Sequence, residues 1–235
     1  MRPMNTRARA TLGLGALGTA MAAVGTAAAQ QPAPAQPVPA PPVAALAAPA
    51  KVKASLGVTH RRLNVRAGRR AVVSGRLRPA RAGRVVTLER LGARGWRTIA
   101  KARTTATGRY VLRYRTLGAD SMKVRVRFRG DRTAHPAKRA LGRLNAFRPA
   151  LASWYGPGLY GNPLGCGGRL APGTVGVAHK TLPCGTKLVL RKGSRIVRAR
   201  VIDRGPYVGA REFDLTQATK YRLGFGSTGT VWVAH

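Results

Sequence analysis

Acidic side chains are almost missing from this chain of 235 residues. Six aspartates and glutamates stand against 43 lysines and arginines, which gives a formal net charge of +37. So basic a surface attracts polyanions, and nucleic acid would be the first candidate inside a cell. Because carboxylates are so few, each one is a candidate for a specific role. They are Glu89, Asp120, Asp131, Asp203, Glu212 and Asp214.

Cysteine is also scarce, with only Cys166 and Cys184 present. Two cysteines without a C-x-x-C spacing are poorly suited to a metal site, and we expect no metal and no cofactor. In an exported protein an even number of cysteines favours a disulfide, which here would close a loop of about 18 residues and contribute roughly 3 kcal/mol. Two buried free thiols are the alternative.

Long apolar runs are confined to the N-terminus. Arg2, Arg7 and Arg9 precede an uncharged stretch rich in alanine and glycine at 10–29, which ends in the small residues TAAA. This pattern is typical of a secretory signal peptide at 1–29, whereas a membrane anchor would be richer in Leu, Ile and Phe. No later stretch approaches a membrane span. We therefore expect an exported protein, secreted or bound to the cell wall, without a nucleic-acid partner or a transmembrane segment in its mature form.

Residues 30–50 consist mainly of proline, alanine and glutamine. Such a segment lacks the apolar side chains needed for a core and favours an extended, polyproline-like conformation. We expect a linker that separates the signal peptide from the folded part.

Residues 51–148 show short runs of alternating apolar and basic residues, the period of a half-buried strand. At 122–129 every even position is apolar and every odd position is basic. Glycine-bearing turns separate seven such runs, which predicts a β-sandwich. The segment resembles the immunoglobulin-like modules of bacterial surface proteins. The predicted strands are 53–58, 71–77, 84–91, 96–103, 109–115, 122–129 and 141–147.

The sandwich segment holds most of the positive charge. It contains 28 basic and three acidic residues, whereas 149–235 contains 12 and three. One interpretation is adhesion to anionic wall polymers such as teichoic acids or the carboxylates of peptidoglycan stems. The other is that arginine simply supplies the polar face of a solvated sheet.

Four short motifs follow one another in the last part of the chain. They are ASWYG at 152–156, VAHKTLPCGT at 177–186, VIDRGPY at 201–207 and EFDLT at 212–216. Together they resemble the RlpA-like double-psi β-barrel of lytic transglycosylases, a fold shared with expansins and family 45 glycoside hydrolases. The resemblance implies an all-β protein, with a six-stranded barrel at 149–235 after the sandwich.

Asp203 is the leading candidate for a catalytic carboxylate. The apolar run at 196–202 predicts a strand that ends at Asp203, followed by a Gly-Pro turn, and a strand end presents a side chain on a rigid frame. Judged locally, Asp203 could instead accept backbone hydrogen bonds within its turn or pair with Arg204. The resemblance favours the catalytic role, because the Asp of this element lies in the family's active-site groove.

The resemblance further implies cleavage of peptidoglycan glycan strands. In a lytic transglycosylase the muramyl C6 hydroxyl attacks its own anomeric carbon and forms a 1,6-anhydromuramyl end. One carboxyl can then act first as acid and later as base, and we assign this to Asp203. Asp214 falls where related families place an Asp and is the second candidate. We expect Glu212 to be a surface or turn residue.

Other residues of the motifs are candidates through the same resemblance. His179 would line the groove, where it could orient Asp203, bind a sugar hydroxyl or tune the pKa of the acid. Tyr155 would contact the glycan face while Trp154 packs in the core. The expected substrate-binding residues are Tyr155, Arg204 and Tyr207.

The sequence departs from the family pattern at one place that matters. Relatives usually carry a Gly-Glu pair upstream of the His, and the corresponding positions are Gly167 and Gly168. We also expect no further domain after the barrel, and we expect a monomer. The alternatives are therefore a lytic transglycosylase, a non-catalytic glycan-binding or wall-loosening protein in the manner of expansins, and a general polyanion adhesin.

Overall fold

The computed structural model describes residues 50–235. The predicted signal peptide at 1–29 and all but the last residue of the predicted linker at 30–50 lie outside the described residues. The described part is almost entirely β-structure, with one short helix, α1 (Gln217–Leu223). It contains no helix with the length and apolarity that crossing a membrane requires. The predicted all-β class is confirmed.

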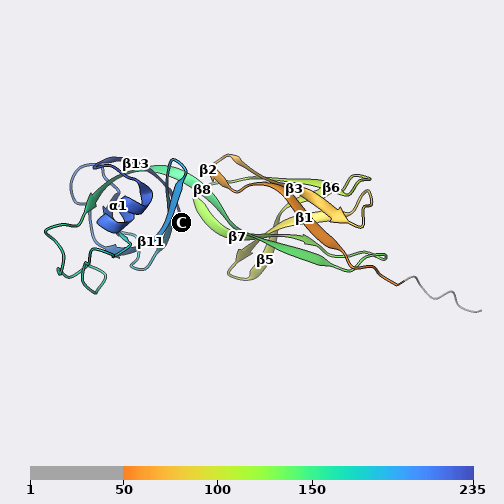
Figure 1. Ribbon diagram of the computed structural model, residues 1–235, viewed down its shortest axis with the longest axis horizontal. Coiled ribbons are helices and arrows are strands. Elements are labelled where there is room, and N and C mark those ends of the chain that lie inside the picture. The colour runs from red at the N-terminus through yellow and green to blue at the C-terminus, as the bar shows by residue number, and fades with distance from the viewer. Residues whose placement is uncertain (1–49) are drawn as a thin grey trace, which may run out of the picture. The chain divides into compact units, whose positions relative to one another are not determined.

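The first part of the chain forms two sheets (Figure 1). One contains β1 (Ser55–Arg62), β3 (Arg70–Arg78) and β6 (Arg109–Arg115); the other contains β2 (Asn64–Arg66), β4 (Val85–Gly92), β5 (Gly95–Arg103), β7 (Asp120–Phe128) and β8 (Ala137–Tyr155). Buried side chains from both sheets, among them Val73, Leu88, Leu112 and Val126, form one core. All seven predicted strands are present, and β2 was not predicted. The assignment to the immunoglobulin-like group stays a prediction.

The alternation predicted at 122–129 holds in β7. Met122, Val124, Val126 and Phe128 are buried, whereas Lys123 between them is exposed. Burying one face of a strand requires this period of two, because successive side chains point to opposite faces.

The three acidic residues of the sandwich serve structural ion pairs. Glu89 is only 2% exposed, and its carboxylate accepts a hydrogen bond of 2.7 Å from Nε of Arg125. Asp131 accepts one of 2.8 Å from Nε of Arg84, and Asp120 lies 3.5 Å from Arg90. These carboxylates are thus committed to particular arginines.

Strand β8 crosses the predicted module boundary at 148/149. The predicted strand 141–147 is only its middle part, because β8 runs without interruption for 19 residues. Its first half pairs with β7, and its second half pairs with β13 (Gly229–Ala234) and β12 (Phe213–Thr216). One continuous strand therefore connects the sandwich to the following strands.

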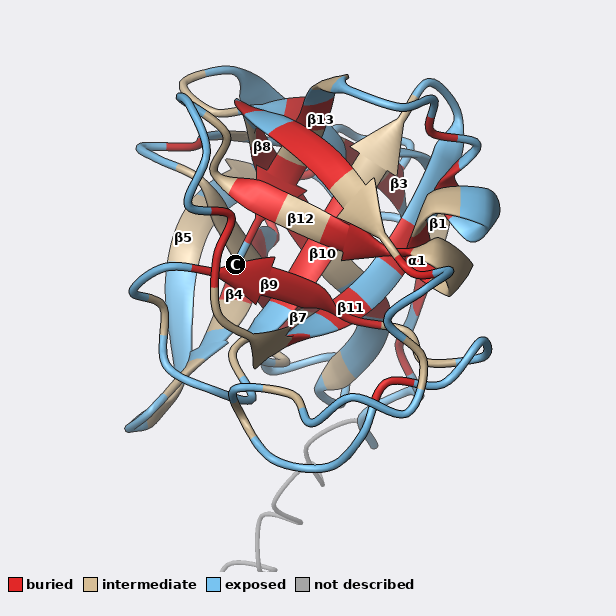
Figure 2. Cartoon of the chain, turned by 90° about the vertical axis from the view of Figure 1, so that its left-hand side faces the viewer, coloured by how far each residue is buried: buried red, intermediate tan, exposed pale blue. Residues whose placement is uncertain are grey.

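The second part of the chain is a closed barrel of six strands. Their order is β12, β9 (Val177–His179), β11 (Arg195–Asp203), β10 (Lys187–Lys192), β13 and β8, and pairing of β12 with β8 closes the ring. The inward side chains are buried, and they include Val177, Leu190, Val201, Phe213 and Val231. Figure 2 shows buried segments of β9 and β12 side by side. The predicted six-stranded barrel is confirmed.

Candidate active site

Two aspartates stand in one row across three neighbouring strands. Asp203 at the end of β11 pairs in register with Ala178 of β9, and Ala178 pairs on its other side with Asp214 of β12. The row continues to Ser153 of β8, which is opposite Asp214. Strands two places apart are separated by about 9–10 Å, which sets the spacing between the backbones that carry the two aspartates. On β12 the flanking Phe213 and Leu215 fill the barrel core, which directs Asp214 to the other face.

Asp203 accepts backbone hydrogen bonds, which is one of the two roles weighed from the sequence. Its Oδ1 accepts hydrogen bonds from the backbone N–H of Gly165 at 2.7 Å and of Arg204 at 2.8 Å. No hydrogen bond to its Oδ2 forms within residues 50–235. The turn thus fixes one oxygen of the Asp203 carboxylate.

Gly165 is needed for this contact. A Cβ at this position would lie 2.9 Å from Cγ of Arg204 and 3.1 Å from Oδ1 of Asp203. Sequence reasoning missed Gly165, because its partner is far away in the chain.

Asp214 is half-buried and accepts a hydrogen bond of 2.6 Å from the hydroxyl of Ser153. Burial is the largest cause that raises the pKa of Asp214, and the charge of Asp203 raises it further. The hydrogen bond from Ser153 and the charge of Arg211 act in the opposite direction. Asp214 is therefore able to hold a proton at a higher pH than an ordinary aspartate.

The raised pKa of Asp214 predicts a pH-dependent stability. A group that binds its proton more tightly in the folded state favours folding below its unfolded pKa, and this contribution is lost as the pH rises through the folded value. We expect Asp214→Asn to increase the free energy of unfolding near neutral pH, because the amide oxygen still accepts from Ser153 and carries no charge. The gain should disappear below the usual pKa of aspartate. Urea titrations across this pH range test it, and an equal gain at every pH would contradict the explanation.

Tyr155 ends β8 beside the two aspartates. Its hydroxyl is buried without a hydrogen-bond partner of normal geometry. Burial is the main cause that raises the pKa of Tyr155, and Asp203 and Asp214 raise it further, so the hydroxyl remains protonated. It is thus an available donor near both carboxyls. Trp154 was predicted to lie in the core, and it is partly buried against the core of the barrel. The ammonium of Lys220 lies 3.4 Å from the centroid of the Trp154 ring.

His179 has a different partner from the one expected. Its Nδ1 accepts hydrogen bonds from the backbone N–H of Thr181 at 3.1 Å and of Leu182 at 3.0 Å. The proton of the neutral ring must then be on Nε2, which lies 3.6 Å from Oε1 of Glu212. Burial is the largest cause that lowers the pKa of His179, which favours this neutral form. Both ring nitrogens thus face groups other than Asp203.

Glu212, expected to be a surface or turn residue, lies between the turn at 209–210 and β12, and its side chain is 29% exposed. Both of its carboxylate oxygens accept hydrogen bonds from the guanidinium of Arg148 on β8, one of them at 2.7 Å. This bidentate bond is the main cause that lowers the pKa of Glu212. The residue therefore fixes β8 near the start of β12 and stands beside His179.

The guanidinium of Arg204, predicted to bind substrate, contacts other groups of the protein. Its Nη1 donates to the carbonyls of His179 at 3.2 Å and Leu182 at 2.9 Å, and its Nη2 lies 2.9 Å from Sγ of Cys184. It therefore holds the loop after β9 in place. The other predicted substrate-binding side chain, Tyr207, is 76% exposed and free to contact a ligand.

The two cysteines form the predicted disulfide. Cys166 and Cys184 are bonded, with their Cα atoms 5.6 Å apart. The bond joins the loop that carries Gly165 to the loop between β9 and β10. Among the described residues no group of three or more His, Cys, Asp or Glu side chains is placed to hold a metal ion.

The position of the missing glutamate is a left-handed turn. Gly167 and Gly168 have φ angles of +91° and +79°, and the carbonyl of Gly168 accepts from the N–H of Leu164. A side chain such as glutamate is disfavoured at such a φ.

The closed six-stranded barrel, with two aspartates in one row, is consistent with a double-psi β-barrel. Residues 149–235 match the model of a family described as "Lytic transglycolase". This part of the chain is therefore similar to the RlpA-like double-psi β-barrel family.

Curated relatives support the same assignment. The chain is 37% identical over 113 residues to a probable endolytic peptidoglycan transglycosylase RlpA of Synechocystis sp., covering 43% of this chain and 35% of the relative. It is 38% identical over 82 residues to the endolytic peptidoglycan transglycosylase RlpA of Campylobacter jejuni, with 34% and 30% covered. For the protein of the same name from Neisseria meningitidis the identity is 38% over 84 residues, with 35% of each chain covered. The chain thus spans about a third of the length of these relatives.

Among solved structures, the chain resembles a tetra-tandem repeat in the extending region of a large adhesion protein. The TM-score is 0.30 and the identity 15%, over 69% of this chain and 39% of that one. This similarity is too weak to define a fold.

Proposed function

We propose that this protein is an exported lytic transglycosylase that cleaves peptidoglycan glycan strands and leaves 1,6-anhydromuramyl ends. The observation that carries the proposal is the row of Asp203 and Asp214 on a barrel similar to the RlpA-like family. The named activity of the relatives supports the substrate class.

In the proposed mechanism Asp203 acts through its Oδ2. It donates a proton to the glycosidic oxygen as the bond from this oxygen to the muramyl anomeric carbon breaks. The muramyl C6 hydroxyl then forms a bond to that carbon and returns its proton to the same carboxylate, so no water is consumed. Asp214 supplies a second carboxyl in the row and Tyr155 a protonated hydroxyl, both suited to bind the sugar.

The activity is tested with purified glycan strands, both with and without stem peptides. Mass spectrometry after incubation should detect 1,6-anhydromuramyl ends. Products with reducing muramic acid ends would indicate hydrolysis instead, and no products from the wild-type chain would reject the proposed activity.

One observation favours a second candidate, a glycan-binding or wall-loosening protein without catalysis. The left-handed conformation of Gly168 removes the carboxylate that relatives usually carry in this loop. A chain that binds insoluble peptidoglycan in high salt without releasing anhydro products would support this candidate.

The proposed partners and location follow from the proposed substrate. Peptidoglycan lies outside the cytoplasm, and the signal-like N-terminus agrees with export to the wall or the medium. Anionic wall polymers are the proposed second partner, through the basic sandwich.

A further inference from the structure

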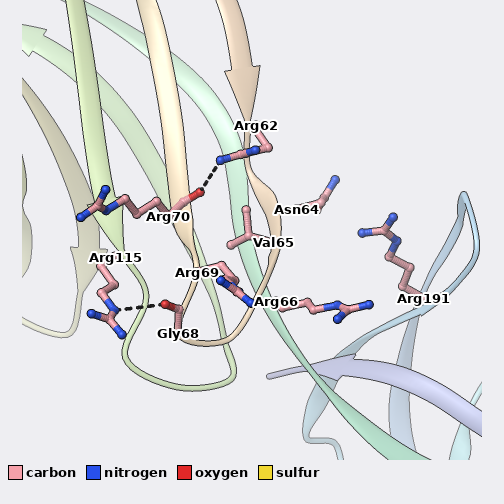
Figure 3. A pocket seen from close by; sticks show the side chains of 9 residues that line it. All are labelled: Arg62, Asn64, Val65, Arg66, Gly68, Arg69, Arg70, Arg115 and Arg191. Atoms are coloured by element: carbon pink, nitrogen blue, oxygen red, sulfur yellow. Dashed lines mark hydrogen bonds between the residues drawn. The ribbon is translucent and has the colours of Figure 1, made fainter.

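A cavity of about 640 Å³ is lined by six arginines (Figure 3). Five of them come from the ends of β1, β2, β3 and β6 and from the turn between β2 and β3, and one comes from β10. They line one open cavity, which offers a specific site for the anionic wall polymers proposed above as a partner of the sandwich. They are Arg62, Arg66, Arg69, Arg70, Arg115 and Arg191.

The charge of this cavity is not neutralised by acidic residues. No carboxylate lines it, and the ion pairs formed within residues 50–235 use other cations. These cations are Arg84, Arg90, Arg125, Arg127, Arg148 and His179. Six guanidinium groups thus face solvent together, although their mutual repulsion opposes it. An anionic ligand would remove that cost.

Backbone carbonyls position several of these side chains. Nη2 of Arg62 donates to the carbonyl of Arg70 at 3.2 Å, and Nε of Arg115 donates to that of Gly68 at 3.1 Å, as the dashed lines in Figure 3 show. Gly68 has a φ of +77°, which sets the tight turn. Each bond uses one of the five N–H donors of a guanidinium and leaves the others for a ligand.

The turn itself is anchored to both sheets. The N–H of Ala67 donates to the carbonyl of Phe147 at 2.8 Å, and the hydroxyl of Thr116 donates to that of Arg69 at 3.0 Å. The arginines are therefore attached to fixed backbone, which lowers the entropic cost of binding.

We propose that this six-arginine cavity binds a polymer of phosphodiester-linked polyols, as a site separate from the carboxylates of the barrel. Guanidinium forks match the paired oxygens of a phosphodiester, which stays ionised at any physiological pH. A polymer with regularly spaced phosphates engages several arginines at once. Two aromatic rings lie beside the cavity, but Phe147 is buried and the ring of Trp232 already carries the guanidinium of Arg66 at 4.7 Å, so little free surface remains for stacking the bases of a single-stranded nucleic acid. The wall location of the polymer rests on the proposed function.

The test compares two triple variants of the full chain with equal loss of charge. Arg62→Gln, Arg69→Gln and Arg70→Gln together remove three exposed arginines from the cavity, and Arg94→Gln, Arg97→Gln and Arg132→Gln remove three exposed ones elsewhere. The probe is poly(glycerol phosphate) of defined length, and binding is measured by titration calorimetry in about 150 mM salt. We expect the cavity variant to bind about tenfold more weakly or worse, with a smaller dependence on salt, and the control variant to change by less than about threefold.

Three outcomes would overturn the proposal. Equal weakening in both variants would show general charge attraction. If polyglutamate binds as tightly as poly(glycerol phosphate) and is weakened equally by the cavity variant, the cavity is a site for carboxylates. If oligothymidylate meets both conditions, the cavity is a nucleic-acid site. Because binding is measured without any cleavage, failure of the proposed enzymatic activity would leave this result unaffected.

Discussion

Asp203→Asn is expected to lower the rate at which 1,6-anhydromuramyl ends form by about 10²–10⁴-fold, the usual contribution of a general acid or base. The fold should survive the change. The asparagine Oδ1 can still accept from the backbone N–H groups of Gly165 and Arg204, which are the bonds that fix this turn. What is lost is the ability to give and take a proton at the glycosidic oxygen.

A matched control is available in Asp120→Asn. Asp120 carries the same side chain in an exposed ion pair, with 39% of both its own side chain and that of Arg90 accessible, so its replacement should change little. Asp214→Asn completes the set. If Asp203→Asn forms 1,6-anhydromuramyl ends at the full rate while Asp214→Asn loses most of this activity, the acid/base role belongs to Asp214. Unchanged activity in both would exclude this row as the catalytic centre.

Features of short range were predictable from the sequence. The alternation at 122–128 identified both the strand and its buried face, because a period of two leaves no other regular structure. The apolar run that stops at Asp203 located the end of β11, because a Gly-Pro pair cannot continue a paired strand. The disulfide was predictable because the chain contains only two cysteines.

Features that depend on distant pairing were not predictable. His179 faces Glu212 because closure of the barrel brings β9 beside β12, with His179 opposite Phe213. Glu212 finds Arg148 through the same closure, across 64 positions of the chain. Local sequence around Glu212 shows only a charged residue next to another, which is typical of a surface.

The predicted strand at 141–147 covered only part of β8, which continues through Pro149 to Tyr155. At Pro149, β8 is paired on one side only, with β13. On its other side, pairing with β7 ends at Ala146 and pairing with β12 begins at Ala152. A proline is tolerated in such a place because its missing N–H can leave the ladder intact. The sequence does not reveal which side of a strand is open.

Loss of the disulfide should be the change with the second largest effect. The bond between Cys166 and Cys184 spans 18 positions, and opening a loop of this size costs roughly 3 kcal/mol of the free energy of unfolding. The loop before β9 would lose its covalent link, and with it the fixed position of the Gly165 N–H that donates to Asp203. Cys184 is also the sulfur that Nη2 of Arg204 contacts. We therefore expect Cys166→Ser combined with Cys184→Ser to lower both stability and glycan cleavage.

Urea unfolding of three samples separates these effects. The oxidised wild type should be the most stable, and the reduced wild type and the double variant should agree with each other, because both lack the same covalent bond. If reduction leaves the unfolding midpoint unchanged, the bond contributes nothing to folding. If stability falls by the expected amount while cleavage stays at the wild-type rate, the loop does not position Asp203, and the bond from the Arg204 N–H to Oδ1 and the end of β11 are enough to hold its carboxylate.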